Sequence, residues 1–130
     1  MLREVKRLIE AQNHSVYICP DVARDCPFKL NRDAAYPTQD WILENQIRVD
    51  KQGRQSDCDV ILSERTVLDN IAYAEWLLRN GKLTVDAYTG LRGRAKAYLL
   101  ENRYDMVFVL APLTLVLDCI RDPDTSYQNQ

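Results

Sequence analysis

Carboxylate and guanidinium side chains follow three short apolar segments of the chain. They are Asp21 and Arg24 after residues 15–19, Glu64, Arg65 and Asp69 after residues 60–63, and Asp118, Arg121, Asp122 and Asp124 after residues 106–111. Phosphoryl transfer uses both types of group. Carboxylates hold Mg²⁺, directly or through water, or accept the proton of the attacking hydroxyl, and arginines neutralise charge on the phosphoryl oxygens. The sequence therefore indicates a candidate phosphoryl-transfer site.

Each of these residues also has a simpler explanation. Glu64 and Arg65 are residues of the kind that fills a solvated loop after a strand. Asp69 has the position of a carboxylate favoured by the dipole at a helix N-terminus. Asp21 and Arg24 are three residues apart, so they would form a local ion pair worth under about 1 kcal/mol.

The spacing of apolar residues predicts the elements that would position these groups. Helices are expected at residues 2–12, 38–51, 66–79 and 84–102, with a helical turn at 21–24, and strands at 15–19, 60–63 and 106–111. Helices that alternate with apolar strands indicate an α/β domain with a mainly parallel sheet. In such sheets ligands bind at the carboxyl ends of the strands, which is where the charged residues stand.

Composition narrows the class of protein. The 130 residues suit one domain, and a net charge of −2 argues against a nucleic-acid or membrane-surface partner, although it does not exclude a local basic patch. No apolar run approaches the roughly 20 residues of a membrane span, so a cytoplasmic location is expected. Four cysteines without a C-x-x-C pair, together with one histidine, predict reduced thiols rather than a zinc site.

Five segments of the chain also carry a resemblance to a family. In order they are VARDCPFKLN, WILENQIRVD, DVILSERTVLDNIAYA, YDMVFVLAP and LDCIRDPDTSYQ. They resemble segments of the P-loop kinase-like ATPases related to the ribosylnicotinamide kinase domain of NadR, grouped with AAA-type ATPases. The resemblance covers nearly the whole chain. It implies a three-layer P-loop architecture, with residues 1–130 as one partial domain and a lid at about 113–130.

The resemblance also implies roles for individual residues. Glu64 would lie near Mg²⁺ at the end of a strand, Arg65 would contact phosphate or substrate, and Asp69 would shape the acceptor site. Asp21 would be a candidate catalytic base and Arg24 would bind substrate opposite them. Arg121 would be the lid arginine over the nucleotide, where Cys119 replaces the glycine usual in the family and puts the flexibility of the lid in question.

One motif of the family is absent from the sequence. The phosphate loop, G-x-x-x-x-G-K-S/T, binds phosphates through backbone N–H groups and a lysine. The chain has glycines only at 53, 81, 90 and 93, and none fits this spacing. The opening residues 1–12 resemble the helix that follows the loop, so we expect the first strand and the loop to be missing at the N-terminus.

These observations lead to two hypotheses. The first is a P-loop ATPase or small-molecule kinase that uses ATP and Mg²⁺ to phosphorylate a nucleoside-like or other small metabolite, and that is inactive as this chain. The second is a non-catalytic α/β module, derived from such a domain, whose exposed apolar surface binds a partner or forms a homodimer. An alternative to both hypotheses is a domain that senses a nucleotide without hydrolysing it.

Overall fold

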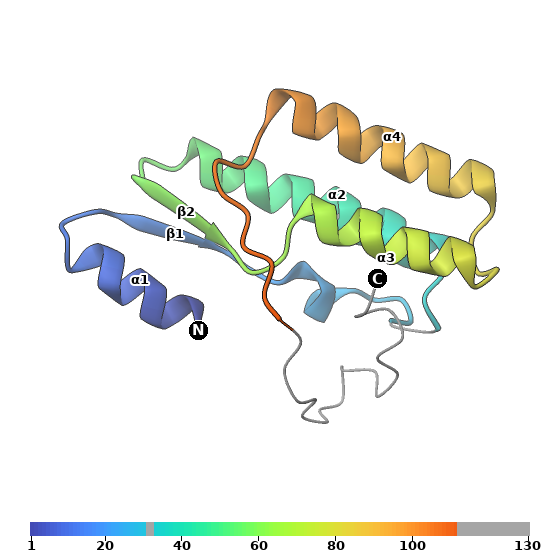
Figure 1. The fold of residues 1–130 in the computed structure, drawn as a ribbon, viewed down its shortest axis with the longest axis horizontal. Coiled ribbons are helices and arrows are strands. Elements are labelled where there is room, and N and C mark those ends of the chain that lie inside the picture. The colour runs from blue at the N-terminus through green and yellow to red at the C-terminus, as the bar shows by residue number, and fades with distance from the viewer. Residues whose placement is uncertain (31–32, 112–130) are drawn as a thin grey trace.

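A computed structural model of the chain describes residues 1–30 and 33–111 (Figure 1). Within these residues the protein is mixed α/β, with four α-helices and a parallel sheet of two strands. The elements are α1 (Leu2–Glu10), β1 (Val16–Cys19), the 3-10 helix η1 (Val22–Asp25), α2 (Tyr36–Gln55), β2 (Val60–Ser63), α3 (Val67–Arg79) and α4 (Val85–Glu101). The predicted lid and Arg121 lie outside the described residues.

The two strands pair in parallel, as the sequence predicts. Val16 lies opposite Val60 and Cys19 lies opposite Ser63. The start of the pair is held by Asp59, whose carboxylate accepts hydrogen bonds from the Ser15 backbone N–H (2.9 Å) and hydroxyl (3.2 Å). These bonds lower the pKa of Asp59.

The prediction of a third strand at residues 106–111 is wrong. Residues 106–111 adopt no strand, and Val107, Phe108 and Val109 are 53%, 79% and 93% exposed. The sequence pattern suits a buried strand, but a strand needs a neighbour for its backbone N–H and C=O groups. In the described residues β1 and β2 pair only with each other, and residues 106–111 do not pair with the outer edge of either strand, so they lack the backbone partners that a strand needs.

Helix α2 is longer than predicted at both ends. It begins at Tyr36, two residues before the predicted start, and Pro37 lies in the first turn, where a missing N–H has no cost. Ala35 is the N-cap, and the buried hydroxyl of Thr38 donates to the Lys29 carbonyl (2.7 Å). At the other end the helix runs through Gly53 to Gln55, beyond the predicted end at residue 51.

Gly53 lets α2 lie against the sheet. A Cβ atom at this position would stand 3.1 Å from Ile61 Cγ2, 3.1 Å from Tyr17 Cδ1 and 3.3 Å from Cys19 Sγ. These distances are shorter than ordinary van der Waals contact. The absence of a side chain at Gly53 therefore sets how closely α2 covers one face of β1 and β2.

Helices α3 and α4 begin and end close to the predicted residues. Thr66 caps α3 by accepting a hydrogen bond from the Leu68 N–H, and Thr84 caps α4 by accepting one from the Ala87 N–H. Gly81, just beyond the C-terminus of α3, has φ of +70°, a conformation that favours glycine. Capping chemistry readable in the sequence thus fixes these boundaries.

The largest hydrophobic core lies among α2, α3 and α4 (Figure 1). Its buried side chains are Ala34, Leu43, Val67, Ala74, Trp76, Leu77, Leu83, Leu91, Ala95 and Tyr98. A smaller cluster of Cys19, Val22 and Val49 joins β1 and η1 to α2. Helix α1 packs beside β1 without burying any residue. None of the helices in residues 1–30 and 33–111 combines the length and the apolar character of a membrane span.

Candidate functional site

The carboxyl ends of β1 and β2 lie at the same edge of the sheet. Cys19 and Ser63 are register partners, and parallel neighbours are about 4.8 Å apart. The chain leaves β1 toward Asp21 and leaves β2 directly into Glu64. Two of the three predicted strand ends therefore meet, whereas the third, at residues 106–111, is not a strand.

Asp21 and Arg24 form a local structure after β1. Asp21 is the N-cap of η1, and its Oδ1 accepts a hydrogen bond from the Ala23 N–H at 3.2 Å. Its other oxygen lies 3.6 Å from Arg24 Nε. The side chain of Asp21 is 20% exposed, so it is partly shielded from solvent.

The segment after β2 contains one free carboxylate. Asp69 completes a capping box, because its Oδ2 accepts from the Thr66 N–H (2.7 Å) while Thr66 caps the helix in return. Arg65 Nη1 lies 3.4 Å from the other oxygen of Asp69, and the Ser63 hydroxyl donates to the Arg65 carbonyl. Glu64 is exposed, and its side chain has no recorded hydrogen bond or ion pair to another described residue, so it is the carboxylate most open to a ligand.

A buried polar network supports this segment from inside. Gln46 Nε2 donates to Asp50 Oδ1 (2.9 Å) and to the Arg65 carbonyl (3.1 Å). The Tyr104 hydroxyl donates to Asp50 Oδ2 (2.5 Å) and accepts from the Val67 N–H (3.2 Å). Gln46 and Asp50 are only 1% and 3% exposed. The network ties α2 and the segment after α4 to the turn that carries Glu64.

Protonation of the neighbouring interior groups is shifted by burial. Burial, together with the bond to Asp50, raises the pKa of Tyr104. Burial also raises the pKa of Cys19 to about 11 and that of Tyr98. The Tyr98 hydroxyl is buried without a hydrogen-bond partner in the described residues. These groups stay neutral near pH 7 beneath the strand ends.

Sequence reasoning missed this network. The apolar spacing that predicts α2 does not mark its polar buried residues; the buried residues of this helix are Thr38, Gln39, Leu43, Gln46, Val49, Asp50 and Gly53. Gln46 and Asp50 are four residues apart, so they lie on one face of the helix. Two polar residues on a face that also carries Leu43 and Val49 were the signal that could have revealed the network.

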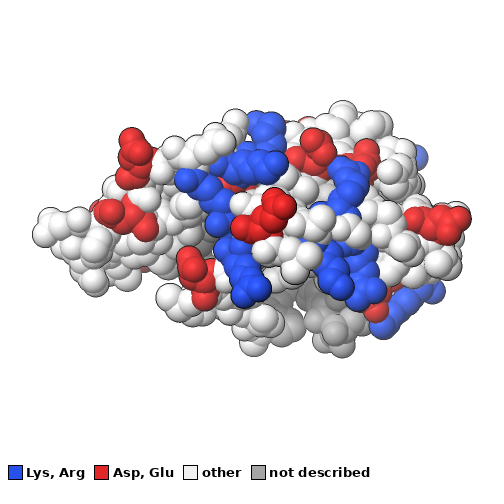
Figure 2. Space-filling model, turned by 90° about the horizontal axis from the view of Figure 1, so that it is seen from above, with Lys and Arg blue, Asp and Glu red and all other residues white. Residues whose placement is uncertain are grey.

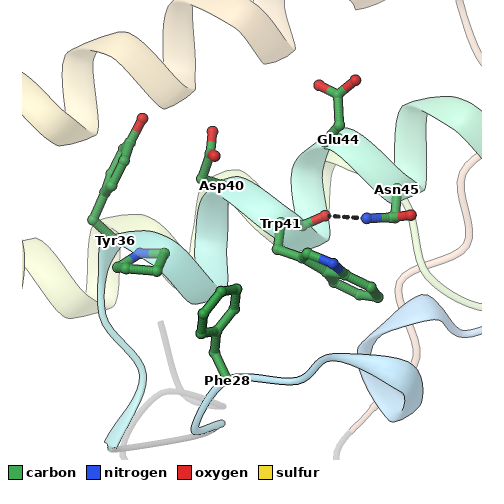
Figure 3. Close-up of a pocket in the computed structure, with 7 residues that line it drawn as sticks. Phe28, Tyr36, Asp40, Trp41, Glu44 and Asn45 are labelled. Carbon is green, nitrogen blue, oxygen red and sulfur yellow. Dashed lines mark hydrogen bonds between the residues drawn. The ribbon is translucent and has the colours of Figure 1, made fainter.

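A pocket of about 370 Å³ opens beside η1, on the N-terminal half of α2 (Figure 3). It is lined by Phe28, Tyr36, Pro37, Asp40, Trp41, Glu44 and Asn45. The rings of Phe28, Tyr36 and Trp41 come from the preceding loop and the helix (Figure 3). Trp41 also packs against the cluster that contains Val22 of η1, so the pocket adjoins the segment that follows β1.

The carboxylates of this pocket are held by a cation from α4. Arg94 donates to Asp40 and, at 2.9 Å, to Glu44. The bond to Asp40 raises the pKa of Arg94. The pocket therefore presents aromatic surface beside a cluster in which one guanidinium offsets one of two carboxylate charges, which suits a planar group that is not anionic.

The described residues contain no group of three or more His, Cys, Asp or Glu side chains placed to hold a metal ion. Cys19, Cys26 and Cys58 are free thiols. Mg²⁺ in phosphate-transferring sites takes one or two carboxylates, water and substrate phosphate oxygens. Glu64 is a single exposed carboxylate at a strand end, which fits that donor set but not a cage made only of protein ligands.

Comparison with known proteins gives no relative. No protein-family model, curated protein or solved structure matched the chain. The family resemblance in the five sequence segments therefore remains a prediction, and the function has to be inferred from the residues themselves.

Proposed function

We propose that the protein is a nucleotide-binding P-loop ATPase or small-molecule kinase. It would transfer a phosphoryl group from ATP to a hydroxyl of a nucleoside-like or other small metabolite. The observation that carries the proposal is the parallel register of β1 and β2, with Cys19 opposite Ser63. This register brings the segments of Asp21 and Glu64 to one edge of the sheet, the edge at which such folds bind ligands.

Each candidate residue has a separate role in the proposed reaction. Asp21, partly shielded at the N-cap of η1, would accept the proton of the attacking hydroxyl, while Arg24 would contact the acceptor. Glu64 would hold Mg²⁺, which when bound supplies charge neutralisation on the phosphate oxygens. Arg65 would contact the phosphate and Asp69 would keep the turn in place.

Arg121 would complete the nucleotide side as the lid arginine; it lies outside the described residues. The aromatic pocket beside η1 supports an acceptor with a planar ring, because Phe28, Tyr36 and Trp41 offer stacking surface.

Turnover of ATP tests the enzymatic proposal. The 130 residues contain no G-x-x-x-x-G-K-S/T segment, so we expect the chain alone to hydrolyse ATP far below the roughly 1 per second typical of kinases. If a G-x-x-x-x-G-K-S/T segment is supplied to the chain, Mg²⁺-dependent hydrolysis that Glu64→Gln abolishes is expected. Rates of about 1 per second from the 130-residue chain would contradict the proposal that it is inactive. A chain that contains the motif but does not hydrolyse ATP would contradict the proposed kinase activity.

Tryptophan fluorescence tests the acceptor pocket without any need for turnover. The two tryptophans are Trp41 in the pocket and Trp76 in the helical core. In a Trp76→Phe variant, millimolar purine or pyrimidine nucleosides are expected to quench the remaining emission saturably. The matched Trp41→Phe variant should show no saturable change. Absence of quenching by every nucleoside would reject a nucleoside-like acceptor.

A second function, the non-catalytic interaction module, is favoured by one observation. Residues 106–110 form a continuous apolar run in which every side chain is at least 53% exposed. Runs of this kind mark surfaces that bind a partner or a second copy. A Phe108→Ser/Val109→Ser variant is expected to unfold like the parent while losing any dimer detected by size-exclusion chromatography. A parent chain that is strictly monomeric at high concentration would count against this function.

A further inference from the structure

Six cationic side chains of α2, α4 and the segment just after α4 have no carboxylate partner among the described residues. They are Arg48, Lys51, Arg54, Arg92, Lys96 and Arg103, all exposed, and we call them the basic surface. Arg48 bonds to the neutral Asn45 amide oxygen, and Arg54 donates to the Arg103 carbonyl (2.8 Å). In the part of the chain that the structure describes, no ion pair is recorded for any of the six.

Several cations elsewhere in the described residues are paired with carboxylates. Lys6, Arg7, Arg24 and Arg65 pair with Glu10, Glu4, Asp21 and Asp69 respectively. On α4 itself, Arg94 forms ion pairs with Asp40 and Glu44. The whole chain carries a net charge of −2, whereas the basic surface is locally positive, so the net charge of the chain does not reveal it.

The basic surface spans two neighbouring helices. The bond from Arg54 to the Arg103 carbonyl shows that the C-terminal ends of α2 and α4 are adjacent. Figure 2 shows the molecule from above, where Lys and Arg side chains form two separate bands with Asp or Glu side chains between and beside them. Glu101 of α4 and Asp105 are exposed carboxylates within two residues of Arg103, and the six cations outnumber them.

The centre of the surface is open to a close approach. Gly93 and Ala97 are exposed on α4, and a Cβ at Gly93 would have no neighbour within 4 Å. The large apolar side chains exposed on α4 are Val85 and Leu100, neither of them aromatic. This part of α4 therefore offers cations and open backbone rather than rings on which unpaired bases could stack.

We infer that the basic surface binds the phosphate backbone of double-stranded nucleic acid without reading its sequence. Guanidinium groups bind phosphate oxygens bidentately, and phosphate contacts alone position a protein on a duplex without specifying bases. The expectation of no nucleic-acid partner rests on net charge, which averages over faces that differ in sign. This inference is independent of the proposed kinase site, because the six cations exclude Arg24, Arg65 and Arg121.

Fluorescence anisotropy with labelled 25-base-pair DNA and RNA duplexes of mixed sequence tests the inference. At 150 mM salt we expect dissociation constants in the range of about 1–100 µM, independent of sequence. The plot of log affinity against log salt should have a slope of about −3 to −5, at about −0.9 per phosphate contacted. Lys51→Gln/Lys96→Gln should weaken binding about tenfold and flatten the slope by about 2.

The matched control is Lys6→Gln/Arg7→Gln, which removes the same number of charges from the paired cations of α1. It should change affinity less than twofold. The inference is overturned if duplexes do not bind at 50 mM salt or if the two variants weaken binding equally. It is also overturned if polyglutamate or anionic phosphatidylserine vesicles bind tighter than the duplex. All the substituted side chains are exposed or half-buried, and thermal unfolding of each variant confirms that the fold is kept.

Discussion

The helical region and the sheet region of this protein differ in how completely they are packed. Among α2, α3 and α4 the side chains of Leu43, Val67 and Leu77 are 0% exposed. On the sheet side neither β2 nor α1 buries a single residue, and the apolar run 106–110 is exposed. A sheet of two strands is marginal by itself, so β1 and β2 depend on α2. The helices therefore supply the stability, while the candidate chemistry lies on the thinly covered side.

Removal of a core leucine should give the largest effect and test the comparison directly. Leu77→Ala is expected to lower the free energy of unfolding by about 3 kcal/mol, because transfer energy is lost and a cavity remains. Leu8→Ala on α1, where the side chain is 52% exposed, should cost less than about 0.5 kcal/mol. Urea denaturation measures both. Equal losses would mean that the sheet side is as well packed as the helical core.

Tyr104→Phe should weaken the connection between the two regions. The substitution removes the donor to Asp50 and the acceptor for the Val67 N–H, and a buried group left without its partner costs about 1–3 kcal/mol. Tyr36→Phe, at an exposed ring, is the control and should be nearly neutral. If hydrogen exchange of the Val67 amide did not change in Tyr104→Phe, the network would not hold the turn of Glu64.

Alkaline pH should destabilise the protein through Cys19. Burial raises the pKa of this thiol to about 11, above the value of about 8.5 in an unfolded chain. Below about pH 8.5 the Cys19 thiol is neutral in both the folded and the unfolded chain, and its contribution to stability is complete. As pH rises toward 11 the thiol ionises more readily in the unfolded chain, so the free energy of unfolding falls, by on the order of 1–2 kcal/mol at pH 10. Cys19→Ala should flatten the fall between pH 8.5 and 10, whereas Cys58→Ala should not. Parallel curves for the parent and Cys19→Ala would contradict this cause.

Two glycine substitutions should change the stability of the protein in opposite directions, and theirs are the smallest effects expected. Gly53→Ala places a methyl group 3.1–3.3 Å from Ile61, Tyr17 and Cys19, and overpacking of this kind should cost about 1 kcal/mol. Gly93→Ala faces open space and should stabilise α4 by up to about 1 kcal/mol. Thermal unfolding of both variants gives the signs. Stabilisation by Gly53→Ala would show that α2 does not lie tightly on the sheet.

Local chemistry made much of the fold predictable. Thr66, Thr84 and Gly81 mark helix ends through capping and positive φ, so α3 and α4 follow from the sequence. The segment 106–111 could not be judged in this way, because its β-branched and aromatic residues describe a strand only if a neighbouring strand exists. Pairing is a property of the whole sheet, and no single segment contains it.

The candidate site was predictable only in its outline. Glu64 after an apolar strand and Asp21 after another are visible in the sequence, and the register of β1 and β2 confirms that these strand ends share one edge. The support by Gln46, Asp50 and Tyr104 joins residues up to 54 positions apart. Such a network depends on tertiary contacts that helical periodicity does not specify.

Nuclear magnetic resonance titration with MgATP tests the central claim, that the edge shared by β1 and β2 is a phosphate-binding site. At millimolar MgATP the backbone amides of residues 19–25 and 63–69 should shift together, and Glu64→Gln should remove the Mg²⁺-dependent part of the shifts. Amides of α1 should not move. Shifts confined to the basic surface of α2 and α4, or no shift at either strand end, would contradict the account.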